Sequence, residues 1–275
     1  MNEFVSANGA KIPRVGLGTW PLAGAEAVDL ISHALSIGYR QLDTAARYAN
    51  EVEVGQAIRA SSVPRGELFV TTKVWPTELA AAAFRKSVED SLSRLSLDYV
   101  DLLLIHWPNP AIPMEEYIGA LNAAASDGLA RHVGVSNFPP QLFEQAVALS
   151  RQPLVANEVE RHPYLHQPKI YDACRKAGAA LIAYSPFARG RLLFSEPAIV
   201  EAAAAHRVTP GQVVLRWNIQ SEGVVVVPRT MNRERMVENL AVTRFELSAA
   251  EMKAIDHLAE RNLRVVNFEF VSSWD

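Results

Sequence analysis

Eight short β-rich runs, separated by helical patterns, constrain the fold of this 275-residue chain more than any other feature. Several runs are continuous apolar blocks, such as VDLLLIHW and GVVVVP, which are typical of strands buried on both faces of a parallel sheet. Eight strands that alternate with helices over this length predict a (β/α)8 TIM barrel. The strands are expected at Val15–Thr19, Tyr39–Asp43, Leu68–Lys73, Val100–His106, His132–Ser136, Leu154–Glu158, Ala180–Ser185 and Gly223–Val227.

Helical patterns fill the stretches between these runs. A late helix is expected after Ser248, an N-cap that Glu251 follows three residues later. The turn Asn8-Gly9 predicts an N-terminal β-hairpin that caps the bottom of the barrel. No Pro/Gly/Ser-rich linker divides residues 1–275, so we expect one domain, which ends in an irregular, aromatic-rich substrate loop at Arg261–Asp275. The other helices are expected at Ala25–Ile37, Ala80–Leu95, Met114–Asp127, Pro140–Leu149, Pro168–Ala177 and Pro210–Gln220.

The composition excludes several classes of partner. The net charge is −3 and no basic stripe is present, so no nucleic-acid partner is expected. The N-terminus lacks the pattern of a signal peptide, and no apolar run is long enough to cross a bilayer. The single cysteine, Cys174, excludes an internal disulfide and suits a reducing compartment. We therefore expect a cytoplasmic protein that has no membrane partner.

Polar residues gather at the predicted strand ends, behind apolar strand bodies. Active sites of barrels lie at the carboxyl ends of the strands. A barrel that needs only stability has no reason to align so many reactive groups on one rim. The groups at the strand ends are Asp43, Lys73, His106, Ser136-Asn137, Asn157-Glu158, Tyr184-Ser185 and Arg229.

Four residues indicate acid catalysis at a carbonyl group. Tyr48 lies in the turn after Asp43, and an unperturbed phenol, with a pKa of about 10, is a poor acid. We expect Asp43 to hold Lys73, and Lys73 to lower the pKa of Tyr48. His106 is expected to hydrogen-bond the substrate oxygen and orient it. Each residue alone also fits a structural role. Together, on neighbouring strand ends, they favour proton donation to a carbonyl that receives a hydride.

The sequence resembles the aldo-keto reductase family from Val15 to Asn239. GYRQLDTAARYANEVEVG matches the family signature, TTKVW carries its lysine and LLLIHWP its histidine. The segments GVSNF, NEVERHPYL, AYSPF and VPRTMNRERMVENL follow in the family's order. The resemblance implies reduction of aldehydes and ketones by a monomer that uses NADPH, with no metal and no Rossmann domain. Gly16-Leu17-Gly18 starts like a dinucleotide fingerprint, but Pro21 stands where its next glycine is required.

By matching position, the resemblance implies roles for individual residues. Tyr48 is the acid in reduction and the base in oxidation. Ser136 and Asn137 hold the nicotinamide carboxamide, and Tyr184 stacks on the nicotinamide ring. The implied catalytic tetrad is Asp43, Tyr48, Lys73 and His106.

The resemblance also places Ser185 and Phe187 next to the pyrophosphate. Glu158 departs from the family, which usually has a glutamine that contacts the carboxamide at this position. A carboxylate can accept a hydrogen bond from that amide but cannot donate one. Cofactor binding or the local pKa balance is expected to change as a result.

The segment Arg229–Asn239 follows the last strand and opens a helix. Barrels commonly bind phosphate there, and a helix N-terminus favours anions. Arg229 and Arg235 add two positive charges. The resemblance implies that they hold the adenosine 2′-phosphate, which favours NADPH over NADH; the alternative is a solvated helix start. Further contacts to the nucleotide are implied for Thr230, Asn232, Glu238 and Asn239.

Short loops predict an open substrate pocket. They are Pro108–Met114 and Ala188–Glu196, and the C-terminal segment is short as well. We expect the pocket to be lined by Trp20, Trp75 and Trp107, unless these only pack at the rim. With its SSWD terminus, the pattern is similar to bacterial 2,5-diketo-D-gluconate reductases. This likeness implies reduction of that keto sugar acid, of methylglyoxal and of other small carbonyl compounds.

Three alternatives remain at this stage. The first is a general aldehyde reductase with an unrelated physiological substrate. The second is a non-catalytic potassium-channel subunit that senses NADPH, since the family fold also occurs in that role. The third is a barrel enzyme of another chemistry, such as a phosphosugar isomerase. An isomerase would need neither Tyr184 nor the two arginines, and binding of NADPH would distinguish it.

Overall fold

The computed structural model describes residues 3–190, 192–271 and 273–274. Eight parallel strands form one sheet, in which strands consecutive along the chain are neighbours in space. Each predicted strand overlaps one of them. The strands are β3 (Leu17–Gly18), β4 (Gln41–Asp43), β5 (Phe69–Val74), β6 (Val100–Ile105), β7 (Ala130–Ser136), β8 (Leu154–Glu160), β9 (Ala180–Tyr184) and β10 (Val224–Val226).

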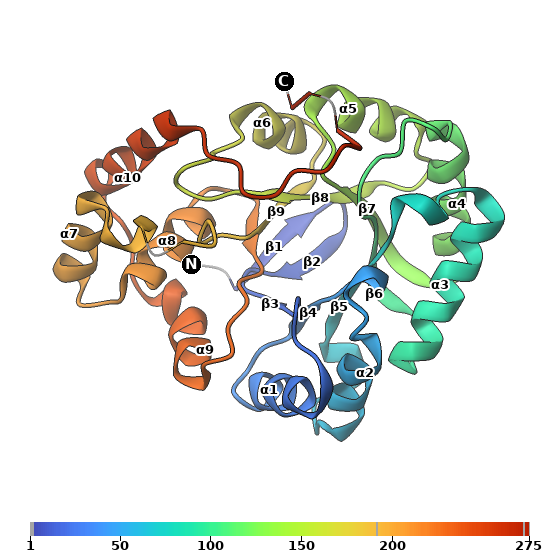
Figure 1. The fold of residues 1–275 in the computed structure, drawn as a ribbon, viewed down its shortest axis with the longest axis horizontal. Coiled ribbons are helices and arrows are strands. Elements are labelled where there is room, and N and C mark those ends of the chain that lie inside the picture. The colour runs from blue at the N-terminus through green and yellow to red at the C-terminus, as the bar shows by residue number, and fades with distance from the viewer. Residues whose placement is uncertain (1–2, 191, 272, 275) are drawn as a thin grey trace.

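The sheet closes on itself between β3 and β10. Val15 forms a parallel bridge with Val226. The amide of Gly16 donates to the carbonyl of Val226 at 2.8 Å, and the amide of Gly18 donates to that of Pro228 at 3.1 Å. The first and last strands are therefore joined, and the predicted (β/α)8 barrel is confirmed (Figure 1).

Helices surround the barrel on its outside (Figure 1). The six helices predicted with both bounds are confirmed to within one residue at each end, and Ser248 and Glu251 form the expected capping box. None of the helices in the described ranges is long and apolar enough to cross a membrane. They are α1 (Gly24–Ser36), α2 (Glu51–Ala60), α3 (Ala81–Leu95), α4 (Met114–Ser126), α5 (Pro140–Leu149), α6 (Pro168–Lys176), α7 (Pro197–His206), α8 (Pro210–Gln220), α9 (Arg233–Leu240) and α10 (Ala249–Asp256).

Short 3-10 helices occur between the main elements. Two of the α-helices, α2 and α7, were not predicted. The buried residues of α7 include Ala202 and Ala203, so its apolar period is weak. The buried face of α2 combines Glu51 and Gly55 with Val54 and Ile58, so it is only partly apolar. The 3-10 helices are η1 (Ala46–Tyr48), η2 (Arg65–Glu67), η3 (Pro76–Glu78), η4 (Leu192–Ser195), η5 (Ala241–Arg244) and η6 (His257–Arg261).

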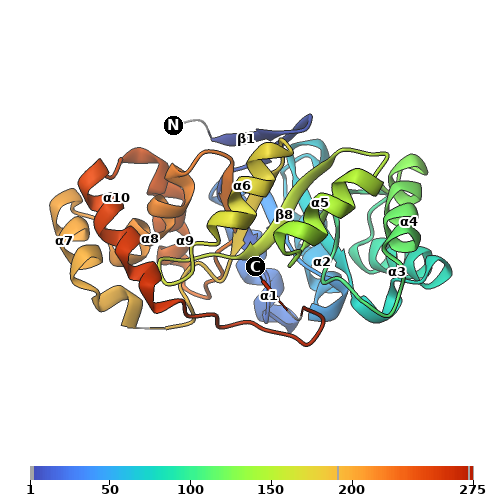
Figure 2. The same ribbon diagram turned by 90° about the horizontal axis from the view of Figure 1, so that it is seen from above.

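The N-terminal hairpin closes one end of the barrel. It consists of β1 (Phe4–Ala7) and β2 (Ala10–Pro13), joined by the expected turn. The side-chain amide of Asn8 donates to the carbonyl of Leu154 at 2.8 Å, so the hairpin covers the amino-terminal ends of the strands. Its buried Val5 and Ile12 pack with apolar residues of the strands. Figure 2 shows the hairpin at one end of the barrel and the C-terminal segment at the other.

Gly55 tests how closely the helices pack against one another. A Cβ at this position in α2 would lie 2.2 Å from the carbonyl oxygen of Leu95 at the end of α3, so the two helices would have to separate. We expect Gly55→Ala to lower the free energy of unfolding by about 1–3 kcal/mol, measured by chemical denaturation.

The matched control is Gly119→Ala, in the exposed part of α4. An added Cβ there meets nothing within 4 Å. Since alanine favours a helix more than glycine does, this variant is expected to gain about 0.5–1 kcal/mol. Equal effects of the two substitutions would contradict the close approach of α2 and α3.

Candidate active site

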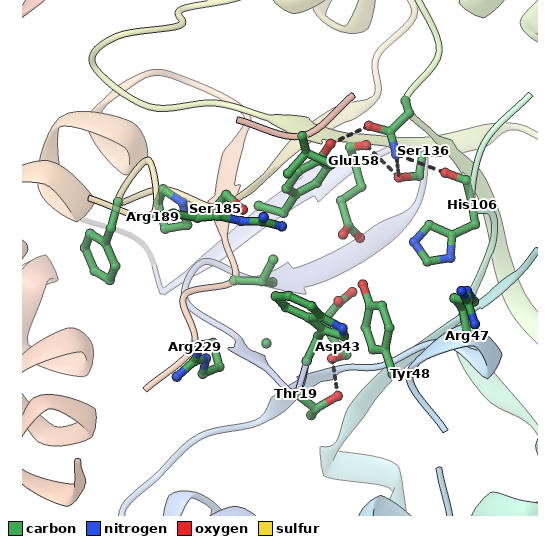
Figure 3. Close-up of a pocket in the computed structure, with 18 of the residues that line it drawn as sticks. Thr19, Asp43, Arg47, Tyr48, His106, Ser136, Glu158, Ser185, Arg189 and Arg229 are labelled. Carbon is green, nitrogen blue, oxygen red and sulfur yellow. Dashed lines mark hydrogen bonds between the residues drawn. The ribbon is translucent and has the colours of Figure 1, made fainter. Parts of the chain in front are cut away.

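A cavity of about 720 Å³ lies at the carboxyl ends of the strands. Residues from loops far apart in the sequence converge on it (Figure 3). Most of the predicted site residues line it. They are Trp20, Asp43, Tyr48, Trp75, His106, Trp107, Ser136, Asn137, Glu158, Tyr184, Ser185, Phe187, Arg229 and Arg235.

Lys73 lies behind the cavity wall, fully buried at the end of β5. Its ammonium nitrogen is 2.6 Å from Oδ1 of Asp43 and 3.2 Å from Oε1 of Glu158. It also donates to the carbonyl of Thr44 at 3.2 Å and to the phenol oxygen of Tyr48 at 3.4 Å. The predicted ion pair of Lys73 with Asp43 is present. Glu158 is a second carboxylate partner of Lys73, which was not predicted from the sequence.

Lys73 lowers the pKa of Tyr48, as expected, but the pKa as a whole is raised above the ordinary value of a phenol. Burial raises the pKa of Tyr48, and this effect outweighs the charge of Lys73, which lowers it. The carboxylates of Asp43 and Glu158 raise it further. Tyr48 therefore holds its proton at neutral pH, as a proton donor must. The pKa of Lys73 is also raised: burial alone lowers it, but the two carboxylates act more strongly in the other direction.

His106 is neutral at neutral pH. Burial lowers its pKa well below the ordinary value, and the charges of Lys73 and Arg47 lower it further. The imidazole ring meets the Tyr48 ring edge-on, with centroids 5.7 Å apart, and the Trp75 ring at 5.1 Å. Its buried Nδ1 has no hydrogen-bond partner in the described part of the chain. A neutral imidazole at this place can donate a hydrogen bond to a bound oxygen.

Ser136, Asn137 and Tyr184 form one hydrogen-bond network along the rim. The amide nitrogen of Asn137 donates to the carbonyl of His106 and to Oγ of Ser136, both at 3.0 Å. Its Oδ1 accepts from the hydroxyl of Tyr184 at 2.7 Å, and Ser136 donates to the carbonyl of Glu158 at 2.8 Å. The network joins the ends of β6, β7, β8 and β9, so it holds the rim in shape.

The loop before α9 places Arg229 at the cavity wall, and the first turn of the helix places Arg235 there. Oδ1 of Asn232 accepts from the amide of Arg235 at 2.9 Å and so caps α9. The hydroxyl of Thr230 accepts from the amide of Asn232 at 3.1 Å. These contacts shape the turn that presents the two arginines.

Four predicted cofactor residues do not line the cavity. Besides Thr230 and Asn232, these are Glu238, which accepts from the Thr209 hydroxyl at 3.4 Å, and the buried Asn239. Their proposed contacts with a nucleotide stay predictions.

Glu160 fastens the C-terminal segment over the site. This fully buried carboxylate accepts from the amides of Val265 and Val266, each at 2.7 Å, and contacts Nε2 of His162 at 2.8 Å. Because Glu160 ends β8, it ties the segment to the rim. Val266 and Phe268 thereby reach the cavity, as part of the substrate loop that was expected at the C-terminus.

The predicted tryptophans differ in their surroundings. Trp107 is only 2% exposed and packs on Phe268, with ring centroids 5.1 Å apart, whereas Trp20 is 48% exposed at the rim. Trp75 packs edge-on against Phe268 at 5.7 Å. Phe268 of the C-terminal segment therefore forms part of the wall of the pocket, which was expected to be open because its loops are short. Ser272 and Asp275 of the SSWD terminus, and residue 191 of the second short loop, lie outside the described residues.

Several residues of the cavity were not predicted from the sequence. Arg47 directly precedes Tyr48 in the family signature, and this position next to the predicted acid could have indicated that it lines the site. Arg189 lies two residues after the AYSPF segment. Phe268 belongs to the aromatic-rich segment Arg261–Asp275, in which the sequence indicated no particular lining residue. The unpredicted residues of the lining include Thr19, Arg47, Arg189, Phe194, Val266 and Phe268.

Known proteins similar to this chain are reductases. Methylglyoxal reductase DkgB of Salmonella typhimurium is 40% identical over 268 residues, which cover 96% of this chain and 99% of that protein. An aldo-keto reductase of Mycolicibacterium vanbaalenii is 44% identical over 252 residues, or 90% of this chain and 89% of the relative. A crystal structure described as a 2,5-diketo-D-gluconic acid reductase B superposes with a TM-score of 0.97 at 43% identity, covering 100% of this chain and 98% of the other.

The sequence pattern of the Aldo/keto reductase family matches residues 14–260. This range contains every strand of the barrel and every residue of the cavity lining except Val266 and Phe268. Family, fold and site agree that the chain is an oxidoreductase that acts on carbonyl groups. The chain belongs to the aldo/keto reductase family.

Proposed function

We propose that this protein reduces aldehydes and ketones to alcohols with NADPH, and that Tyr48 donates the proton. The observation that carries the proposal is the position of Lys73. Its ammonium lies 2.6 Å from Asp43 and 3.4 Å from the oxygen of Tyr48, at the wall of a cavity that His106 also lines. A protonated phenol, a cation behind it and a neutral imidazole beside it suit proton transfer to a carbonyl oxygen.

Tyr48 and His106 would act together on the carbonyl oxygen. As negative charge develops there, the hydroxyl of Tyr48 donates its proton, and the neutral imidazole of His106 donates a hydrogen bond. The phenolate that Tyr48 becomes is stabilised by the ammonium of Lys73, which Asp43 keeps charged and in place. In the oxidation of an alcohol, the same phenolate takes the proton back.

The residues of the cavity fit a long anionic cofactor. Arg189, Arg229 and Arg235 all line it, and Figure 3 shows Arg189 and Arg229 on the side away from His106. NADPH, when bound, supplies the hydride to the carbonyl carbon. Arg229 and Arg235, beside the N-terminus of α9, would hold the 2′-phosphate.

The remaining cofactor roles follow the resemblance. Ser136 and Asn137 would hold the carboxamide, Tyr184 would pack on the nicotinamide ring, and Ser185 and Phe187 would lie at the pyrophosphate. All five residues line the cavity, which supports these assignments.

Glu158 is the second carboxyl group, besides Asp43, that contacts the ammonium of Lys73. Oε2 of Glu158 and Oδ2 of Asp43 are buried without a hydrogen-bond partner among the described residues. Burial raises the pKa of Glu158 well above its ordinary value, and the charge of Asp43 adds to the rise, while Lys73 opposes it. A hydrogen bond with Asp43 also raises this pKa, so the proton of a neutral Glu158 would lie between the two carboxyl groups.

We further propose that the chain acts as a monomeric single domain in the cytoplasm. The monomer follows the resemblance to the family. The free cysteine, Cys174, is buried, and a reducing compartment suits it.

The test of the proposed function is oxidation of NADPH by the purified protein with a panel of carbonyl compounds. The panel includes 2,5-diketo-D-gluconate and methylglyoxal, which the similar proteins are named for, and aromatic aldehydes. Loss of NADPH absorbance that depends on the carbonyl compound supports a reductase. NADPH binding without turnover of any compound would point to the sensor role, and no binding would point to another barrel chemistry.

Removal of the proton donor gives the first prediction. Tyr48→Phe is expected to lower turnover by ~10²-fold or more, because the phenol proton is lost, while NADPH still quenches protein fluorescence as in the wild type. Tyr171→Phe is the matched control, since its hydroxyl donates only to the exposed carbonyl of Glu222 at 3.0 Å. Near-normal carbonyl reduction by Tyr48→Phe would refute the role of Tyr48.

Removal of one phosphate-binding charge gives the second prediction. Arg235→Ala is expected to weaken NADPH binding about 10-fold or more and to leave NADH binding nearly unchanged, since only NADPH carries the 2′-phosphate. Arg233→Ala is the matched control, because Arg233 lies in the same turn of α9 but pairs with Asp29 at 2.5 Å. An unchanged preference for NADPH over NADH in Arg235→Ala argues against this contact.

The buried carboxylate gives the third prediction. Between the ordinary pKa of a glutamate, about 4.3, and the raised pKa of Glu158, the folded protein holds more protons than the unfolded chain. Stability therefore falls as the pH rises through this window, and Glu158→Gln removes that loss. The melting temperature of Glu158→Gln relative to the wild type is expected to increase from about pH 4 to pH 8. A constant or shrinking difference over this range contradicts the raised pKa.

A further inference from the structure

We propose that Arg47 selects carbonyl substrates that carry a carboxylate, so that the preferred substrates are anionic oxo acids rather than neutral carbonyl compounds. This inference rests on the proposed function, because it concerns which carbonyl compounds enter that same site. The names of similar proteins leave the choice open: one is named for methylglyoxal, which is neutral, and one for a diketo acid, which is an anion.

Arg47 lies on the carbonyl side of the cavity. It directly precedes Tyr48 in η1 and belongs to the cavity lining. Its guanidinium carbon is 5.4 Å from the centroid of the Trp75 ring, which in turn packs edge-on against His106. Figure 3 shows Arg47 next to His106, on the side of the cavity away from Arg189 and Arg229. The position of Arg47 therefore separates it from the arginines at the nucleotide end.

The guanidinium of Arg47 has no carboxylate partner within the described ranges; the ring of Trp75 is its recorded contact. Some exposed arginines elsewhere on the molecule are paired, such as Arg85 with Glu89 at 2.8 Å and Arg175 with Glu222 at 2.7 Å. Stacking on an aromatic ring leaves the N–H donors at the edge of the guanidinium free to bind a ligand. Arg47 thus presents a charged, bidentate donor to whatever occupies the carbonyl side.

The surroundings favour an anion at this position. The charge of Arg47 contributes to the lowered pKa of His106, so it acts on the group that would face the carbonyl oxygen. Asp43 and Glu158 also line the cavity, but Lys73 offsets the charge of Asp43, and the raised pKa of Glu158 favours its neutral form. Lys73 is occupied by these carboxylates. Among the described residues at the end of the cavity that holds Tyr48 and His106, Arg47 is therefore the cation that remains available to a substrate.

Apolar walls strengthen the interaction. Trp75 packs on both Arg47 and Phe268, and the two aromatic residues line the cavity. An ion pair formed against such walls is screened less than one in open water. With the carbonyl oxygen held between Tyr48 and His106, a carboxylate near the carbonyl carbon would meet the guanidinium fork. A neutral ester or methyl ketone has no carboxylate to accept from the N–H groups of the Arg47 guanidinium.

The experiment compares substrates that differ in the carboxylate alone. Succinic semialdehyde is paired with its methyl ester, and 4-carboxybenzaldehyde with methyl 4-formylbenzoate. The measured quantity is the ratio of kcat/KM for the acid to that for the ester. The wild type is expected to favour the acid. Arg47→Gln is expected to lower this ratio about 10-fold or more, chiefly through a higher KM for the acid, because one charge-assisted contact is lost.

Two variants serve as controls. Arg47→Lys keeps the charge but not the planar fork, so an intermediate ratio is expected. Arg189→Gln removes an equal charge from the other side of the same cavity, where Arg189 lies 5.3 Å from the ring of Trp20. Its ratio is expected to stay within about twofold of the wild-type value. Rising salt should lower the acid preference of the wild type and leave that of Arg47→Gln unchanged.

The outcomes separate this inference from the proposed function. If the wild type reduces neither acids nor esters, the reductase proposal fails. If it reduces both and Arg47→Gln leaves the ratio unchanged, Arg47 does not select substrates and the inference is overturned. The inference is also overturned if Arg47→Gln lowers NADPH binding and affects acid and ester equally, because Arg47 would then act on the cofactor.

Discussion

The buried ammonium of Lys73 is the interaction on which the rest of the site depends. Removing a charge from water costs several kcal/mol, and good geometry with opposite charges offsets this cost. Asp43 supplies the nearer partner, at 2.6 Å from the next strand, and Glu158 supplies the second at 3.2 Å. Glu158 is on β8, three strands away from Lys73 on β5. The ion pair therefore spans the interior of the barrel, which a flat sheet would not allow.

This charge cluster organises the acid chemistry around it. Tyr48 is protonated because burial and two carboxylates outweigh one lysine, and His106 is neutral because burial and nearby cations disfavour its charged form. One group can then give up a proton while its neighbour offers a hydrogen bond. The cations of the cavity lining are divided in the same way: arginines at one end suit nucleotide phosphates, and Arg47 faces the carbonyl side. The division gives the cavity two ends with different ligands.

Much of the fold could be predicted from the sequence because its signals are local. Short β-rich runs, several of them apolar blocks, marked every strand. The six helices predicted with both bounds were correct to within a residue at each end, and a cap marked the start of α10. The helix α7 was not predicted because its buried alanines hardly change the hydrophobic period, and α2 was not predicted because its buried face includes Glu51 and Gly55. At the site, strand-end positions identified Asp43, Lys73 and His106. The contact of Glu160 with the amides of Val265 and Val266 joins residues more than a hundred positions apart and has no local signal.

By itself the sequence determined the order of strands and helices, the barrel class, and which chemical groups stand at the strand ends. These follow from hydrophobic periodicity and from position along each strand. Only the tertiary structure decided the protonation of Tyr48 and His106, the sharing of Lys73 between two carboxylates, and the side of the cavity that Arg47 faces. The pKa of a buried group depends on desolvation and on charges brought by distant strands. Those quantities exist only once the barrel has closed.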